Sequence, residues 1–574
     1  MELSDSSSGR SPAASNVEGS ARGGVEIGAV GASHERVSAG KVPGSEEVAT
    51  DEVLGPPRIV AVIDIGVSSI RMAVAEIRPC RDEGVRILEQ LVQPVDLGRS
   101  VFSQRRLKRG SIEKAASVML GYRKMLDEYG VDVQRDVRVV ATTAVREATN
   151  AMAFADRIFV ATGFRVRPID EAEVNRITYV GVMPQLDAHP HLSDGKTVVV
   201  EVGGGTTEML VIRGGNVLQS GSYRMGSIRS AAGPDRVAAG SVRRRGMFEN
   251  QVRQTLAQMT DAVVRDAGAE LPTVELLALG GDVRFAAHQL NEDWDGEAPI
   301  GIDTQSFAEL TDVIARLELD EIVRQYGVSY IEAETLGPAL SIYRILAEQL
   351  SRDTIYVAET NLRDGLLRDI QRGGDWTADF RHQIIRSAIA LGRRYRFDET
   401  HGRNVAESSK SLFEALEPMH HLSPRHGVLL YVAALLHEIG MIVNVRSNHK
   451  HAMYLIRNSN MFGLSRHECF LVSLIVRYHR RSYPKPQHSD FAGLSQVERI
   501  VVAKLAAILR IAISLDDRRS GLLNSPQVRI VGDEVHITAD RVDDVSMERL
   551  AVRENSGLFR DVFGMSVRLG TGRN

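Results

Sequence analysis

Two stretches of the chain share one order of hydrophobic and polar positions. Residues 58–77 read RIVAVIDIGVSSIRMAVAEI, and residues 197–212 read TVVVEVGGGTTEMLVI. Each stretch has an apolar run, an acidic residue, a glycine-containing loop, two hydroxyl side chains and a second apolar run. Apolar runs of this length are typical of buried strands, and the short loop returns the chain as a hairpin. The pattern therefore predicts two similar strand–loop–strand units, whose acidic residues lie 137 positions apart.

The loops of these two units are candidates for phosphate binding. Three consecutive glycines leave backbone N–H groups uncovered, and such groups bind phosphate. For one loop alone, an ordinary glycine-rich hairpin explains the sequence equally well. Two matching loops favour a cleft that holds phosphate from both sides, while Asp64 and Glu201 hold a divalent cation or an attacking water. The expected phosphate-binding positions in the loops are Gly66, Ser68, Ser69, Gly203, Gly204, Gly205 and Thr206.

Other patterns divide the rest of the chain. The first 56 residues are rich in Ser, Gly, Ala and Glu with almost no aromatic residue, which predicts a disordered tail rather than a secretory signal. From residue 377 to about 515, apolar residues recur at helical spacing, as in LLYVAALLHEIGMIV at 429–443. Beyond this region, VRIVGDEVHITAD at 528–540 alternates as strands do. We expect a small α/β segment at the end of the chain.

Composition is that of an ordinary globular protein. Of its 574 residues, 43% are hydrophobic and 25% are charged, and the length suggests several domains. The net charge of −4 gives no support for a nucleic-acid partner. Two cysteines, Cys80 and Cys469, lie far apart and form neither a zinc set nor a disulfide framework. No apolar run approaches membrane-spanning length. These observations favour a cytoplasmic protein without an integral membrane segment.

Both loop segments resemble those of a known family. VIDIGVSSIRM and VEVGGGTTEML are similar to the two phosphate loops of the exopolyphosphatase/guanosine pentaphosphate phosphohydrolase family, within the actin-like ATPase superfamily. VVATTAVREATN at 139–150 resembles the family segment whose arginine faces the phosphate chain, which implies that role for Arg146. PIDEAEVNRITYVGV at 168–182 resembles the segment with the catalytic glutamate, which implies Glu173.

Two further segments extend the resemblance to roughly residues 58–515. SGSYRMGSIR at 220–229 and LLALGGDVR at 276–284 are similar to later strand–loop pieces, which places Arg224 and the Gly280-Gly281 pair near the cleft. The implied fold is a duplicated actin-like (ribonuclease H-like) α/β half, an all-α HD-like domain and a small α/β C-terminal segment. The expected boundaries are 1–56 for the disordered tail, 57–183 for actin-like domain I, 184–370 for domain II, 377–515 for the HD-like domain and 516–574 for the C-terminal domain. A homodimer is the expected assembly.

The chemistry of phosphoanhydride hydrolysis assigns roles to these residues. The reaction needs an activated water and charge neutralisation on the transferring phosphoryl group. Glu173 is the candidate general base, and Glu208 is placed to orient the same water or a magnesium ion. Asp64 and Glu201 are the expected Mg²⁺ ligands. The candidate arginines for binding phosphate oxygens are Arg71, Arg146 and Arg224.

The sequence departs from the family pattern at three places. The family has aspartate where this chain has Glu201, and a Ser-Asn pair where this chain has Ser68-Ser69 after Val67. The glycine before the segment of the catalytic glutamate is replaced, giving Asp170-Glu171-Ala172. A displacement of about one ångström can cost on the order of 100-fold in rate. The departures therefore bear on catalytic efficiency more than on reaction type.

The histidine-rich helical region carries a second candidate site. LLHEIG resembles the metal-binding core of HD-type phosphohydrolases, with Glu438 in place of the usual aspartate. LRIAISLDD at 509–517 resembles the terminal metal-ligand helix of that fold. The implied divalent-metal ligands are His401, His437, Glu438 and Asp516. The favoured alternative is a degenerate HD fold in which these histidines pack the core.

Three functions compete. The first is an exopolyphosphatase that needs Mg²⁺ and releases orthophosphate from inorganic polyphosphate. The basic stretch VRYHRRSYPK at 476–485 supports it, because Arg480 and Arg481 would bind a long anionic polymer. The second is a hydrolase of the 5′-terminal phosphate of guanosine pentaphosphate. The third is a catalytically weak sensor that binds polyphosphate or nucleotide. An ATPase or sugar kinase is disfavoured, because no segment suggests an adenosine pocket.

Overall fold

The computed structural model describes residues 57–78, 84–231, 246–257, 274–373, 376–521, 523, 526–539 and 544–571. The tail expected over residues 1–56 lies outside the described residues. The description below concerns the compact unit Leu54–Asn574.

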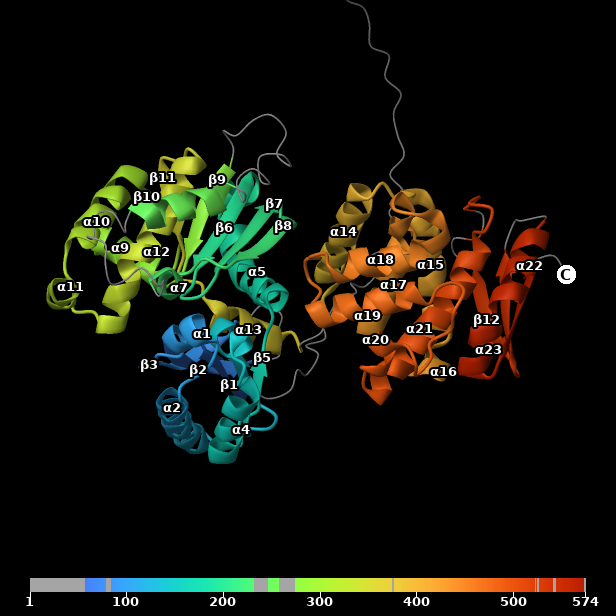
Figure 1. The fold of residues 1–574 in the computed structure, drawn as a ribbon, viewed down its shortest axis with the longest axis horizontal. Coiled ribbons are helices and arrows are strands. Elements are labelled where there is room, and N and C mark those ends of the chain that lie inside the picture. Colours follow the sequence, from blue (N-terminus) through green and yellow to red (C-terminus); the bar gives the residue numbers. More distant parts are fainter. Residues whose placement is uncertain are drawn as a thin grey trace, which may run out of the picture. The chain divides into compact units, whose positions relative to one another are not determined.

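The first sheet has five strands in the order β3-β2-β1-β4-β5 (Figure 1). Its strands are β1 (Arg58–Ile65), β2 (Ser69–Ile77), β3 (Arg86–Pro94), β4 (Val137–Ala141) and β5 (Val166–Pro168). The first three form an antiparallel meander, and β4 and β5 add in parallel beside β1.

Both faces of this sheet are covered, which explains the continuous apolar run of β1. Ala61 and Ile63 of β1 pack in a cluster with residues of α2 (Arg109–Glu128) and α4 (Ala151–Thr162). Val60 and Val62 point to the other face, where they pack with residues of α5 (Glu171–Ala188) and α13 (Leu362–Gln371). A strand buried on both faces reads as an unbroken hydrophobic segment.

The second sheet has six strands in the order β10-β11-β9-β6-β7-β8. Its strands are β6 (Lys196–Val202), β7 (Thr207–Arg213), β8 (Asn216–Tyr223), β9 (Val274–Leu279), β10 (Ile300–Asp303) and β11 (Thr354–Val357). Here too, three strands form an antiparallel meander, and β9 and then β11 add in parallel beside its first strand, while β10 pairs antiparallel with β11 at the edge. This repeated topology fits the actin-like first half that the sequence predicts.

Helices connect and cover the second sheet. Residues of α9 (Gly281–Leu290) and α12 (Tyr330–Gln349) form one core cluster with alternate side chains of β6. Other helices of the first half are α1 (Gly98–Gln104), α3 (Thr143–Glu147), α6 (Pro190–Ser193), α7 (Ser227–Ala231), α10 (Thr304–Arg316) and α11 (Leu319–Tyr326). Asp64 and Glu201, the acidic residues of the two hairpins, lie at equivalent positions. Each is on the first strand of the antiparallel meander of its sheet.

From residue 376 onward the described chain is mostly helical. Its helices are α14 (Ala378–Arg394), α15 (Glu399–Ala415), α16 (Glu417–His420), α17 (Pro424–Leu436), η3 (Ile439–Ile442), η4 (Val445–Ser447), α18 (Asn448–Arg457), α19 (Arg466–Arg477), α20 (Ser489–Ala492) and α21 (Gln496–Leu515). A three-stranded sheet follows, which consists of β12 (Gln527–Val531), β13 (Glu534–Ala539) and β14 (Ser566–Thr571). Two helices, α22 (Ser546–Asn555) and α23 (Gly557–Phe563), connect β13 to β14. The HD-like assignment of the helical region stays a prediction.

One segment corrects the expectation that no apolar run approaches membrane-spanning length. Pro424–Ile442 is long and apolar enough to cross a membrane by length and composition, with a mean hydropathy of 1.2. However, 61% of this window is buried inside the fold, and the regular helix α17 has 13 residues, fewer than the roughly 20 that a span requires. Packing of α17 against α14, α15, α19 and α21 explains its apolar composition.

Candidate active site

The two hairpin loops have the same local structure. In the first loop, the Gly66 N–H donates to the Ser69 carbonyl at 3.0 Å, and in the second the Gly203 N–H donates to the Thr206 carbonyl at 2.9 Å. Each loop is therefore closed by an equivalent hydrogen bond between two residues that are three positions apart in the sequence. The backbone N–H of Gly204 donates to no other described residue, as the phosphate hypothesis requires.

The glycines of the second loop allow it to approach the first loop and two helices beside the first sheet, α1 and α3, closely. A Cβ at Gly204 would lie 3.0 Å from the Val67 Cβ, and one at Gly205 would lie 2.8 Å from both Phe102 and Thr143. The hydroxyls of Thr143 and Thr206 are 3.1 Å apart. Gly204 and Gly205 are thus required by packing of the second loop against the first loop and against α1 and α3, in addition to any role in binding phosphate.

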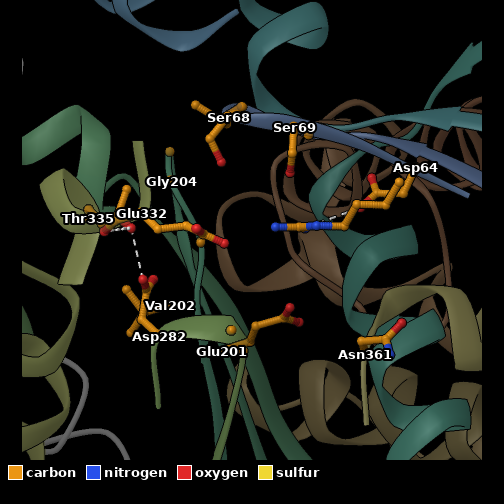
Figure 2. A pocket seen from close by; sticks show the side chains of 18 of the residues that line it. Asp64, Ser68, Ser69, Glu201, Val202, Gly204, Asp282, Glu332, Thr335 and Asn361 are labelled. Carbon is orange, nitrogen blue, oxygen red and sulfur yellow. Dashed lines mark hydrogen bonds and ion pairs between the residues drawn. The ribbon is translucent and has the colours of Figure 1, made fainter. Parts of the chain in front are cut away.

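One pocket is lined by both loops (Figure 2). The sequence-predicted residues that line it are Asp64, Gly66, Ser68, Ser69, Arg71, Glu201, Gly203, Gly204, Gly205, Thr206, Glu208, Gly280 and Gly281. The fold thus brings together residues from positions 64 to 281 of the chain.

Two pairs of charged residues lie opposite each other on the hairpin strands. Asp64 pairs with Arg71 across β1 and β2, and Glu201 pairs with Glu208 across β6 and β7. Residues directly opposite in an antiparallel pair project from the same face, with Cβ atoms about 5 Å apart. The first hairpin therefore presents a carboxylate and a cation to the pocket, and the second presents two carboxylates.

The pocket carboxyls have raised pKa values. Burial raises the pKa of Asp64, whose Oδ1 has no hydrogen-bond partner among the described residues, although Arg71 acts in the opposite direction at 3.7 Å. Burial also raises the pKa of Glu208, to about 7, although the nearby hydroxyls of Ser222 and Thr206 act in the opposite direction. The orphaned oxygen of Asp64 and the nearby carboxylate of Glu201 fit a Mg²⁺ ion, which prefers oxygen ligands.

Three arginines line the pocket, and sequence reasoning missed two of them. Arg71 was a candidate, whereas Arg284 on α9 and Arg363 on α13 were not. The Nη1 of Arg284 and the Nε of Arg363 are buried without a hydrogen-bond partner among the described residues. Burial lowers the pKa of Arg363, and the charge of Arg71 adds to this effect. A bound phosphate would satisfy these groups, because a guanidinium pairs strongly with phosphate oxygens.

Sequence signals for the two missed arginines existed but were weak. Arg284 ends the LLALGGDVR segment, four residues after the first of its two glycines. Arg363 lies in the first turn of α13, directly after the cap residue Asn361 and Leu362. Neither position repeats the hairpin pattern that identified the loops.

Glu173 does not face the pocket. Its carboxylate accepts hydrogen bonds of 2.8 and 3.0 Å from Arg176, which also binds Asp369 at 2.7 Å. Burial favours the neutral form of Glu173, but the hydrogen bond and charge of Arg176 outweigh it and lower the pKa. The next residue on α5, Val174, lines the pocket instead. This geometry argues against the predicted role of Glu173 as general base, because successive helix residues point about 100° apart.

The other predicted arginines lie outside the pocket lining. Arg146 donates to the Ile169 carbonyl at 3.0 Å, and the exposed Arg224 pairs with Glu147 at 3.0 Å. Arg480 and Arg481 follow α19 in the helical region, and Arg481 is exposed. Phosphate binding by these four residues stays a prediction.

The predicted metal ligands of the helical region lie together. Donor atoms of His401, His437 and Glu438 lie within 4.8 Å of one another, and the Nδ1 of His401 is 2.8 Å from Asp516. His437 donates from Nδ1 to the Ala434 carbonyl at 2.7 Å. With Nδ1 as the donor, the Nε2 of His437 is a buried nitrogen with a free lone pair, and it has no hydrogen-bond partner in the described chain.

This donor set fits a divalent transition metal. Imidazole nitrogens whose other ring nitrogen is hydrogen-bonded are the usual arrangement of metal-bound histidines. The guanidinium of Arg519, however, already binds both oxygens of Glu438 at 2.8 Å. Metal binding at this cluster therefore stays a prediction, because a metal ion would compete with Arg519 for the carboxylate of Glu438.

Comparison with known proteins places the chain in a family. A model of the Ppx/GppA phosphatase family matches residues 74–372, and a model of Ppx/GppA phosphatase domain III matches residues 385–551. A protein of Vibrio atlanticus (strain LGP32) named guanosine-5'-triphosphate,3'-diphosphate pyrophosphatase is 24% identical over 493 residues, which is 85% of this chain and 92% of that protein. A protein of the same name from Aeromonas hydrophila is 25% identical over 472 residues, or 80% and 88% of the two chains.

Solved structures of related proteins have low overall similarity to this chain. The Ppx/GppA family member of Aquifex aeolicus is 24% identical and has a TM-score of 0.46, covering 56% of this chain and 100% of that one. An exopolyphosphatase from Cytophaga hutchinsonii is 20% identical with a TM-score of 0.48, covering 55% and 98%. The family assignment depends instead on the first family model, which alone spans more than half of the chain. The chain belongs to the Ppx/GppA phosphatase family.

Proposed function

We propose that the chain is a phosphohydrolase that cleaves a terminal phosphoanhydride bond held between the two hairpin loops. The observation that carries this proposal is the pocket itself, in which two equivalent loops bring buried carboxylates and three arginines together. A phosphoryl transfer site needs this combination of cations for the phosphate charge and a base for the attacking water.

Glu208 is the base in this proposal. A carboxyl with a pKa of about 7 is half ionised near neutral pH, so it can accept a proton from water and release it again. Arg71, Arg284 and Arg363 neutralise the phosphate oxygens, and the loop N–H groups orient them. Asp64 and Glu201 would hold Mg²⁺, which supplies further neutralisation of the transferring phosphoryl group.

Guanosine pentaphosphate is the first substrate candidate. It is favoured because the curated relatives, matched over most of their length, are named guanosine-5'-triphosphate,3'-diphosphate pyrophosphatase. Inorganic polyphosphate, the first choice from sequence, becomes the second candidate. Its support is the exposed Arg481 with the half-buried Arg480 beside it, since a long polymer reaches beyond the pocket.

A phosphate-release assay on both substrates tests the proposal. The wild-type protein, with and without Mg²⁺, is given guanosine pentaphosphate and long-chain polyphosphate at matched concentrations of terminal phosphate. We expect Mg²⁺-dependent release of orthophosphate, faster from guanosine pentaphosphate. Tight binding of either ligand without any phosphate release would replace the hydrolase by the third function, a binding sensor.

A further inference from the structure

One short segment binds the carbonyl groups of the second loop. The backbone N–H groups of residues 227–229, at the start of α7, donate to the carbonyls of Gly203 and Gly204 at 2.9 to 3.0 Å. The side chain of Arg229 completes the set, because its Nε donates to the Gly205 carbonyl at 2.6 Å. Three consecutive peptide groups of the loop are therefore held by their oxygens.

The N–H groups of the same three peptides have no partner. A planar trans peptide directs its C=O and its N–H to opposite sides. Binding of the carbonyls at α7 therefore directs the N–H groups of Gly204, Gly205 and Thr206 away from α7. Within the part of the chain that the structure describes, none of these N–H groups donates a hydrogen bond to the backbone. All three residues line the pocket, so the loop offers three consecutive donors to a bound anion.

The guanidinium of Arg229 is itself fixed by two neighbours. Its Nη2 donates to Glu147 Oε1 at 2.7 Å, and its Cζ lies 4.1 Å from the centroid of the Phe102 ring. Glu147 ends α3 and Phe102 belongs to α1, so both neighbours lie on helices beside the first sheet. Only 16% of the Arg229 side chain is exposed, and a hydrogen bond is electrostatically stronger where water is excluded.

The first loop is held in a different way. The carbonyls of Val67 and Ser68 accept three backbone N–H groups from residues 95–98, each at 3.0 Å. These donors are uncharged, whereas Arg229 gives the second loop a charged one. A hydrogen bond from a guanidinium is stronger than one from a neutral group, and it polarises the peptide so that its N–H becomes a better donor. The N–H of Thr206 therefore gains most, because it belongs to the peptide that Arg229 binds.

We infer that Arg229 is a positioning residue, which fixes and polarises the Gly205–Thr206 peptide so that its N–H donates to a phosphate oxygen. This inference rests on the proposed function, because it takes the second loop as the phosphate site. Arg229 does not line the pocket, so it acts through the loop. The sequence pattern singled out Arg224 in this segment, since the contact of Arg229 with the loop exists only in the fold.

Steady-state phosphate release tests the inference on folded protein. The substrate is guanosine pentaphosphate in Mg²⁺, and each protein is assayed well below its melting temperature. We expect Arg229→Ala to lower kcat at least about tenfold, with a smaller change in KM, because preorganised donors act mainly on the transition state. Arg229→Lys should recover part of this loss, since lysine keeps a cation but lacks the fork of donors that reaches both Gly205 and Glu147. Arg157→Ala is the matched control with unchanged kcat, because exposed Arg157 pairs with Glu113 at 2.8 Å outside the pocket lining.

Added guanidinium ion separates positioning from a purely structural role. In Arg229→Ala, the Phe102 ring and the Glu147 carboxylate remain and form a site for a free guanidinium ion. Guanidinium chloride, below the concentration that unfolds the variant, should raise the kcat of Arg229→Ala severalfold. NaCl at equal ionic strength should not, and guanidinium should leave the kcat of Arg157→Ala unchanged.

Amide exchange separates failure of this inference from failure of the proposed function. In Glu208→Gln protein, tripolyphosphate with Mg²⁺ should slow deuterium exchange in peptides that cover residues 203–206, as measured by mass spectrometry. Adding Arg229→Ala should reduce this protection, and adding Arg157→Ala should preserve it. Wild-type protein that releases no phosphate would end the proposed function and leave amide exchange to decide the role of Arg229. An unchanged kcat in Arg229→Ala, no rescue by guanidinium, or full protection of the loop in Arg229→Ala would overturn the inference.

Discussion

Glu201 and Glu208 lie directly opposite each other on β6 and β7, as two carboxylates on one face of the sheet. The equivalent positions of the first hairpin hold Asp64 and Arg71, a carboxylate and a positively charged guanidinium. The duplicated fold thus places four charged residues around one pocket, but with unequal chemistry in its halves. Burial is the main cause of the raised pKa of Glu208 and the charge of Glu201 adds to it, whereas the hydroxyls of Ser222 and Thr206 and the charge of Arg146 act in the opposite direction. Catalysis is therefore expected from the second hairpin.

Glu173→Gln should leave turnover within about tenfold of wild type, because removal of a positioned base costs about 100-fold or more and Glu173 is not positioned. The same change weakens a buried ion pair with Arg176, so it should lower the melting temperature. Steady-state phosphate release and thermal unfolding measure the two effects. A folded variant with turnover reduced more than 100-fold would restore Glu173 as the base.

Arg363→Gln should reduce kcat/KM by about 10- to 100-fold, because it removes a buried guanidinium that has no protein partner at Nε in the described chain. Arg224→Gln is the matched control, since Arg224 is exposed and outside the pocket lining. Its kcat/KM should stay within about twofold of wild type. Equal losses in the two variants would mean that the pocket arginines have no special role in binding phosphate.

Gly205→Ala should lower the melting temperature and the activity together. The new Cβ would lie 2.8 Å from Phe102 on α1 and Thr143 on α3, closer than real Cβ contacts, so the second loop and these side chains must move apart. Gly110→Ala is the control, because a Cβ at the start of α2 meets nothing within 4 Å. Thermal unfolding of both variants checks the prediction, and an unchanged melting temperature for Gly205→Ala would show that the second loop is not tightly packed against α1 and α3.

The purified protein should carry about one divalent transition-metal ion per chain in the histidine cluster. Metal analysis by mass spectrometry should show its loss in His437→Ala and its retention in His467→Ala, whose histidine is exposed and paired with Glu498. Arg519→Gln should raise the metal content of dilute samples, because it frees the carboxylate of Glu438. Metal-free wild-type protein that takes up no added metal would favour a histidine-packed core.

Local patterns predicted the hairpins well, because a strand–loop–strand unit is determined by about twenty consecutive residues. Asp64 and Glu201 could be placed at the pocket for the same reason. Arg363 could not, since α13 brings it to Asp64 from a distant part of the chain. Glu173 shows a different difficulty: on a helix, a shift of one position turns a side chain to another face, and the sequence did not show that Val174 rather than Glu173 lines the pocket.

The pH dependence of kcat/KM, measured side by side for wild type and Glu208→Gln, tests the central role of Glu208 most directly. Because the ionised carboxylate is the active form, the wild-type rate should rise with pH through the pKa of about 7 and then level off. Glu208→Gln should lose about 100- to 10,000-fold in rate together with this rising limb, while keeping its affinity for GDP. If Glu208→Gln instead retains more than a tenth of the wild-type rate, or shows the same rising limb, Glu208 is not the base and the account of the pocket is wrong.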